Sequence, residues 1–160
     1  MFSENRIFTF HTENNSKLFE DEHYLCIIDG SPHHGKNLYS SKDFLTAYLN
    51  KTFKKFLKNI NGGYVGFIFN KKKKETISFR DRFGLKPIYY YNKNNILILS
   101  SQSDYINTYF NSKIDLNYNY IYRYAYSNYK SIYGREETMF QDVKMQKISS
   151  IYTFKNKNLF

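Results

Sequence analysis

One short segment carries charged residues that could hold a turn rigid or bind a partner: Arg80, Asp81, Arg82 and Lys86. A carboxylate flanked by two guanidinium groups can accept charge-assisted hydrogen bonds. Gly84 permits a positive φ, and Pro87 fixes φ and has no amide hydrogen, so the segment is typical of a defined turn. Solvated charges at an ordinary turn are the alternative interpretation.

Other residues that could do chemistry lie in the first quarter of the chain. Cys26, the single cysteine, stands within a continuous apolar run and is expected to be a small core residue rather than a nucleophile. His33 and His34 are adjacent, so their side chains should point apart, and no pair of ligands has metal-site spacing. Gly35-Lys36 lacks the preceding glycine of a phosphate-binding loop. We therefore predict no metal and no cofactor.

The composition limits the class of protein. The 160 residues suit one domain over 1–160, and the single cysteine fits a reducing, cytoplasmic compartment. No apolar run approaches the length of a membrane span, so we expect no membrane association. The formal net charge of +10 permits a polyanionic partner, but the lysines are spread along the chain and no nucleic-acid-binding motif accompanies them. Nucleic-acid binding, which salt-sensitive association would reveal, is therefore not expected.

The spacing of apolar residues predicts the elements that position the charged segment. A short strand is expected over 6–10, a loop over 11–22, a buried strand over 23–29 and a further loop over 31–36. An amphipathic helix should begin after the Ser40-Ser41 cap and run to about residue 59, before Asn61-Gly62-Gly63. Lysines occupy its polar side, and Asp43 lies in its first turn.

The rest of the chain reads as strands followed by helices. Four strands in meander order are expected over 64–70, 75–80, 87–92 and 95–101. Helices should cover 102–110 and 117–127, although the alternate tyrosines of the second also fit a strand. A last strand is predicted over 148–154. A helix packed on an antiparallel sheet indicates the α+β class.

The turn and its neighbours together resemble a known family. Asn-Gly-Gly-Tyr-Val-Gly-Phe-Ile-Phe precedes the turn at 61–69, Ile-Leu-Ser-Ser-Gln-Ser-Asp-Tyr follows at 98–105, and a segment beginning Thr-Met-Phe-Gln-Asp-Val starts at 138. In this order, with Arg-Asp-Arg-Phe-Gly-Leu-Lys-Pro-Ile-Tyr-Tyr-Tyr at 80–91, they are similar to the glutaminase domain of asparagine synthetases, a class II glutamine amidotransferase domain. The resemblance covers roughly 22–154. It implies the N-terminal-nucleophile fold, a four-layer sandwich of two mainly antiparallel sheets between helices.

The resemblance also implies where catalytic groups should be. Glutaminases of this class use an N-terminal cysteine whose own α-amine is the base, and Phe2 stands here instead. The family's Asn-Gly-Glu loop aligns with Asp29-Gly30-Ser31, where a carboxylate would repel an oxyanion. The segment that holds the glutamine amino group aligns with 40–43, where Lys42 precedes Asp43. We therefore expect no catalytic residue, and a remnant substrate pocket at Asp29, Gly30 and Asp43.

Two functions fit this pattern. The first is a catalytically silent, stand-alone domain that supports a separately encoded, ATP-dependent, asparagine synthetase-like enzyme, since no Ser-Gly-Gly-x-Asp-Ser pyrophosphatase loop occurs in the chain. The second is a diverged amidotransferase subunit that still binds or hydrolyses glutamine or a related amide. In the first case, a separate synthetase-like enzyme or a second copy of the chain should contact the turn. The expected interface residues are Arg80, Asp81, Arg82, Gly84, Lys86 and Tyr90, and an internal brace is the alternative role for Arg80 and Asp81.

Overall fold

The computed structural model describes residues 5–9, 17–127, 136–155 and 158–159. It divides the chain into two compact units, each built from two separate segments. The four-stranded unit contains Met1–Thr9 and Pro87–Lys147, and the six-stranded unit contains Phe10–Lys86 and Ile148–Phe160. The expectation of one domain over 1–160 stays a prediction.

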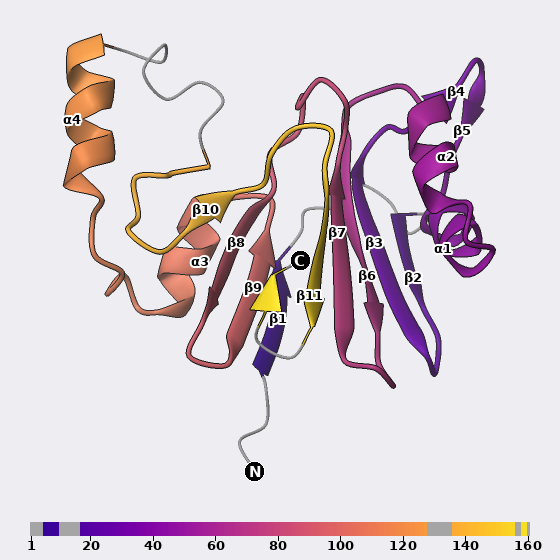
Figure 1. The fold of residues 1–160 in the computed structure, drawn as a ribbon, viewed down its shortest axis with the longest axis horizontal. Coiled ribbons are helices and arrows are strands. Elements are labelled where there is room, and N and C mark those ends of the chain that lie inside the picture. The colour runs from indigo at the N-terminus through magenta and orange to yellow at the C-terminus, as the bar shows by residue number, and fades with distance from the viewer. Residues whose placement is uncertain (1–4, 10–16, 128–135, 156–157, 160) are drawn as a thin grey trace. The chain divides into compact units, whose positions relative to one another are not determined.

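The six-stranded unit is organised around an entirely antiparallel sheet (Figure 1). Its strands, in spatial order, are β12 (Asn158–Leu159), β11 (Ile151–Lys155), β7 (Glu75–Arg80), β6 (Tyr64–Asn70), β3 (Tyr24–Gly30) and β2 (Leu18–Glu20). The unit also contains a separate two-stranded hairpin, formed by β4 (His33–His34) and β5 (Asn37–Leu38). The strands predicted over 23–29, 64–70 and 75–80 are confirmed, and the last predicted strand begins at Ile151 rather than Ile148.

Two helices of this unit supply much of its core, and they replace the single predicted helix. α1 (Ser41–Leu49) lies against β2 and β3, and α2 (Phe53–Asn59) follows after a break in which Lys51 adopts a φ of 58° (Figure 1). Phe44 and Phe53 both pack on Phe79, with ring centroids 5.1 and 5.2 Å away. In an unbroken helix these two phenylalanines would lie about half a turn apart around the axis. The break therefore lets both rings enter one core.

The four-stranded unit has a mixed sheet. Its order is β1 (Asn5–Thr9), β9 (Ile96–Ser100), β8 (Tyr89–Lys93) and β10 (Lys144–Met145). β1 pairs with β9 in parallel, whereas the other neighbours are antiparallel. α3 (Ser103–Tyr109) packs beside β8 and β9 and buries Ile106, which joins Tyr91, Ile98, Phe140 and Val143 in a core cluster.

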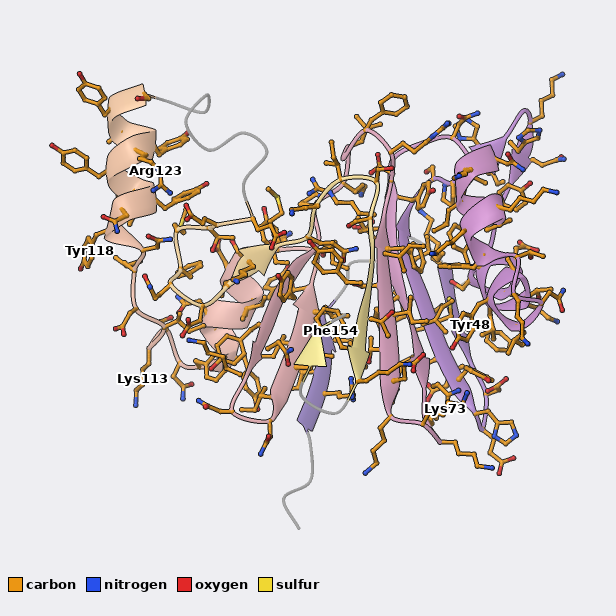
Figure 2. All side chains as sticks on the ribbon, viewed as in Figure 1. Tyr48, Lys73, Lys113, Tyr118, Arg123 and Phe154 are labelled. Carbon is orange, nitrogen blue, oxygen red and sulfur yellow. The ribbon has the colours of Figure 1, made fainter. Side chains whose placement is uncertain are left out.

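A second helix of this unit, α4 (Tyr118–Ser127), settles the ambiguity over the alternate tyrosines. The side-chain oxygen of Asn117 accepts a hydrogen bond from the amide of Tyr120 at 3.1 Å, and this cap starts the helix. α4 has no buried residue, and Tyr118 projects from its first turn (Figure 2). Arg123 of α4 forms an ion pair with Glu137.

Two parts of the predicted fold are confirmed, the α+β class and the presence of two mainly antiparallel sheets. The described residues form four helices and two main sheets of this kind. Besides the single helix, three predictions were wrong. The loop expected over 31–36 contains strand β4, because His33 and His34 pair with Asn37 and Leu38 in a short hairpin. The segment 11–22 was expected to be loop throughout, but β2 forms there as a three-residue edge strand; residues 11–16 lie outside the described part. The four strands do not form one meander, because β6 and β7 belong to one sheet and β8 and β9 to the other.

Candidate functional site

The turn after β7 is organised around the carboxylate of Asp81, which is 1% exposed. One of its oxygens accepts hydrogen bonds from the amides of Phe83 at 2.9 Å and Leu85 at 3.2 Å. The other accepts from the amide of Lys86 at 3.2 Å. The carbonyl of Asp81 also accepts from the amide of Ser149, which ties the turn to the chain entering β11. These contacts make Asp81 the internal support of the turn.

Arg80 stabilises the same turn from the end of β7. Its Nε donates to the carbonyl of Lys86 at 2.8 Å, and its Nη2 donates to the carbonyl of Gly84 at 3.0 Å. Gly84 has a φ of 65°, so the positive φ predicted for it is confirmed. A methyl group there would overlap Cγ2 of Ile148 and approach Arg80 Nη2 at 3.2 Å. Glycine is therefore required for both conformation and space.

The tip of the turn is exposed. Arg82 donates to the side-chain oxygen of Asn61 at 2.6 Å, and its guanidinium lies 5.8 Å from the ring centroid of Phe83. Phe83 is 72% exposed, and Leu85 is exposed as well. Arg80 and Asp81 thus support the turn from within, while Arg82, Phe83 and Leu85 present a mixed cationic and apolar surface.

Lys86 connects this turn to the loop expected to be the remnant of a substrate pocket. Its ammonium lies 2.9 Å from a carboxylate oxygen of Asp29, which is buried, whereas Lys86 is half-exposed. Gly30 follows with a φ of 115°, and a methyl group there would overlap the carbonyl oxygen of Gly63. The structure therefore brings Asp29, Gly30 and Lys86 together, with the charge of Asp29 engaged by an ion pair.

Asp43 has a different environment. Its carboxylate accepts hydrogen bonds from the amide of Ser40 at 2.8 Å and from the hydroxyl of Ser40 at 2.7 Å. This is the helix-start arrangement expected for a carboxylate in the first turn of α1. Its described contacts are those of a helix cap.

Tyr90 belongs to the four-stranded unit, whereas the turn residues up to Lys86 belong to the six-stranded unit. It is only 4% exposed, and its hydroxyl lies 3.3 Å from a carboxylate oxygen of Glu136. Of the tyrosines at 89–91, Tyr89 is the most accessible. A contact of Tyr90 with a partner stays a prediction.

The other reactive side chains lie in structural positions. Cys26 is fully buried in β3, and burial raises the pKa of its thiol far above the ordinary value. His33 and His34 each place Nδ1 near a backbone carbonyl, of Ser31 at 3.1 Å and of Asn59 at 2.8 Å. Within the described ranges, no cluster of three histidine, cysteine or acidic side chains could hold a metal ion. Phe2 lies outside the described residues.

A pocket of about 330 Å³ opens beside the turn, entirely within the six-stranded unit. We call it the basic pocket; its lining residues are Lys54, Leu57, Lys58, Tyr64, Arg80, Arg82, Ser149, Ser150 and Ile151. Burial, and then the nearby carboxylate of Asp81, raise the pKa of Tyr64 to about 12. Tyr64 therefore keeps its proton at neutral pH.

Sequence reasoning identified Arg80 and Arg82 but not the pocket that they line. Lys54 and Lys58 are four residues apart and were interpreted only as the polar side of a helix. Their spacing places both on one side of α2, which was the available signal. Ser149 and Ser150 come from the far end of the chain, so no local pattern could have associated them with the turn.

Over the described residues, no helix is both long enough and apolar enough to cross a membrane. In a comparison with family models, the model of a family described as glutamine amidotransferase domain matches residues 34–159. Comparison with curated proteins gives no match. The matched region contains the turn and every residue that lines the basic pocket.

Proposed function

This chain belongs to the glutamine amidotransferase domain family, and from this premise we propose that it is a catalytically silent member. Within that family we assign it to the class II, asparagine synthetase type, on the strength of the Arg-Asp-Arg-x-Gly-x-Lys-Pro turn. The proposal includes the four-layer sandwich of N-terminal-nucleophile hydrolases. Its role would be to support a separately encoded, ATP-dependent amide-forming enzyme.

The observation that carries the proposal is the position of the chain's single cysteine. Glutaminases of this class need an accessible thiol as nucleophile. Cys26 is fully buried in β3, and burial disfavours its thiolate. Among the 160 residues of the sequence, no other thiol could replace it.

The environment of Asp29 supports the same conclusion. The family's loop supplies a neutral donor near a developing oxyanion, whereas Asp29 presents a carboxylate that already pairs with Lys86. Two changes would be needed to recover a donor there, since the carboxylate would have to be replaced and Lys86 released. A fixed negative charge opposes an oxyanion rather than stabilising it.

Ammonia release from glutamine tests the silence. The purified chain should release no more ammonia than a blank, and the Cys26→Ala variant should give the same rate. Turnover that thiol alkylation abolishes, and that Cys26→Ala lacks, would refute the proposal. Calorimetry with glutamine distinguishes the silent domain from the alternative function, a diverged subunit. Heat of binding without turnover would indicate a diverged subunit that still binds glutamine.

The partner is expected to contact the exposed tip of the turn. Phe83 is 72% exposed beside the guanidinium of Arg82, and an aromatic ring next to an arginine is a frequent anchor of protein interfaces. Lys86 is a poor choice for testing this contact, because its removal would leave Asp29 buried without its cation. Phe83 can be changed with little effect on the fold.

The partner test compares two exposed apolar residues of the six-stranded unit. Phe83→Ser should weaken co-purification with an ATP-dependent amide-forming enzyme from native cells, whereas Leu38→Ser, at a position 74% exposed on β5, should not. Sedimentation velocity of the purified chain checks self-association with the same pair of variants. Equal behaviour of the two variants in both assays would refute a role for the turn as an interface.

A further inference from the structure

The basic pocket has the features of a ligand site that the proposed function does not use. We propose that it binds a small organic ligand bearing a phosphate group. The inference rests on the pocket's own residues and does not depend on whether the chain hydrolyses glutamine. Three of the pocket's lining residues, Lys54, Leu57 and Lys58, come from α2, whose side chains are drawn with all the others in Figure 2.

Two lysines on α2 provide mobile positive charge at the pocket. Lys54 and Lys58 are both exposed and lie one helical turn apart on the same side of α2. Among the described residues, neither Lys54 nor Lys58 forms an ion pair with a carboxylate, unlike Lys71, Lys86 and Lys155 of the same unit. The charges of Lys54 and Lys58 are therefore available to an anion.

Arg82 adds a fixed positive charge to the lining of the pocket. It is oriented by the side-chain oxygen of Asn61, which is uncharged and therefore does not neutralise the guanidinium group. A planar guanidinium group held in place is well suited to phosphate oxygens. Arg80 also lines the pocket, but it is committed to the turn through the carbonyls of Gly84 and Lys86, and the proposal does not depend on its charge.

The nearest carboxylate does not cancel this charge. Asp81 is 1% exposed, lies outside the set of lining residues, and directs its oxygens to three backbone amides of the turn. The lining itself has four cationic side chains and no acidic one. Such an excess favours a phosphate dianion over a singly charged carboxylate, because the attraction grows with the charge of the ligand.

The remaining lining residues suit the organic part of such a ligand. Leu57 and Ile151 contribute apolar surface, and Tyr64 contributes an aromatic ring. Ser149 and Ser150 add hydroxyl groups that can donate to phosphate or sugar oxygens. A volume of about 330 Å³ falls within the range of small-molecule pockets and suits a compact ligand such as a mononucleotide.

The experiment is isothermal titration calorimetry on the whole chain with three probes: AMP, inorganic phosphate and glutamate. AMP tests a phosphate attached to an organic group, and inorganic phosphate tests the phosphate alone. Glutamate tests whether an anion that carries carboxylates in place of phosphate binds equally well. The disrupting variant is Lys54→Ala with Lys58→Ala. The matched control is Lys42→Ala with Lys55→Ala, which removes the same charge from exposed positions of α1 and α2 that do not line the pocket.

AMP should bind the parent and the control alike, more tightly than inorganic phosphate, and increasing salt should weaken it. Loss of both pocket lysines should weaken AMP binding about tenfold or more, since each substitution removes one favourable charge–charge attraction with the phosphate group. Arg82→Gln should weaken it as well. Absence of AMP binding, tighter binding of glutamate, or equal losses in the control would each overturn the proposal. The melting temperature of each variant is measured first, and only variants that melt like the parent are compared. This control excludes unfolding as the cause of weaker binding.

Discussion

Replacing Gly84 with alanine tests the geometry of the turn directly. The backbone at Gly84 has a φ of 65°, a conformation that costs a residue with a β-carbon about 1–2 kcal/mol. The added methyl group would also overlap Cγ2 of Ile148, and crowding of this kind costs typically about 1–3 kcal/mol. Ile148 is 51% exposed and can yield, so the lower end of that range applies. We therefore expect Gly84→Ala to lower the free energy of unfolding by about 2–3 kcal/mol.

Gly35 provides the matched control. It has a similar φ of 58°, but a methyl group there would meet nothing within 4 Å. Gly35→Ala should therefore cost only the backbone part, about 1–2 kcal/mol. Urea unfolding followed by circular dichroism measures both variants. The difference between them reports the crowding against Ile148.

A double substitution checks the cause. Ile148→Ala removes the methyl group that Gly84→Ala would strike, so the two changes together should cost about 1 kcal/mol less than their sum. Equal effects of Gly84→Ala and Gly35→Ala, together with additivity in the double variant, would refute the close approach of Gly84 to Ile148.

Two further predictions concern charged and titrating groups of the same unit. Lys86→Met should lower the free energy of unfolding by about 1–3 kcal/mol, because the buried Asp29 would lose its cation. The control Lys72→Met, in an exposed turn, should change it little. An unchanged urea midpoint for Lys86→Met would contradict the ion pair. The pKa of Tyr64 is raised from 10.0 to about 12, so the unfolded chain releases this proton first and stability should fall as the pH rises from 10 to 12. Tyr64→Phe should reduce that fall by about 1–2 kcal/mol in denaturation measured across this range, and identical pH profiles would show that the hydroxyl is accessible in the folded state.

The elements with a clear local pattern were predictable. β3 and β6 follow apolar runs, β7 follows an alternation of polar residues with Ile77 and Phe79, and the turn after β7 follows from its glycine and its charged residues. The edge strand β2 was missed because a segment of three residues is too short to display a period. Its pairing with β3, rather than its own composition, makes it a strand.

Long-range packing decided the remaining differences. The break between α1 and α2 lets Phe44 and Phe53 share one core, which no count of apolar spacing could reveal. The change of sheet between β7 and β8 occurs where the unit boundary falls, after Lys86. The basic pocket was hidden for the same reason, since α2, the turn and Ser149 meet only through the fold.

The interleaving of the two units has a consequence for the order in which the chain can fold during its synthesis. β7 is made early, but its partner β11 follows only after the central segment of the four-stranded unit. Until Ile151–Lys155 leaves the ribosome, one edge of β7 has neither its amide nor its carbonyl partners from β11. An open edge of this kind invites pairing with another nascent chain. The six-stranded sheet is therefore exposed to aggregation during translation, and its closure depends on a segment that is synthesised well after β7.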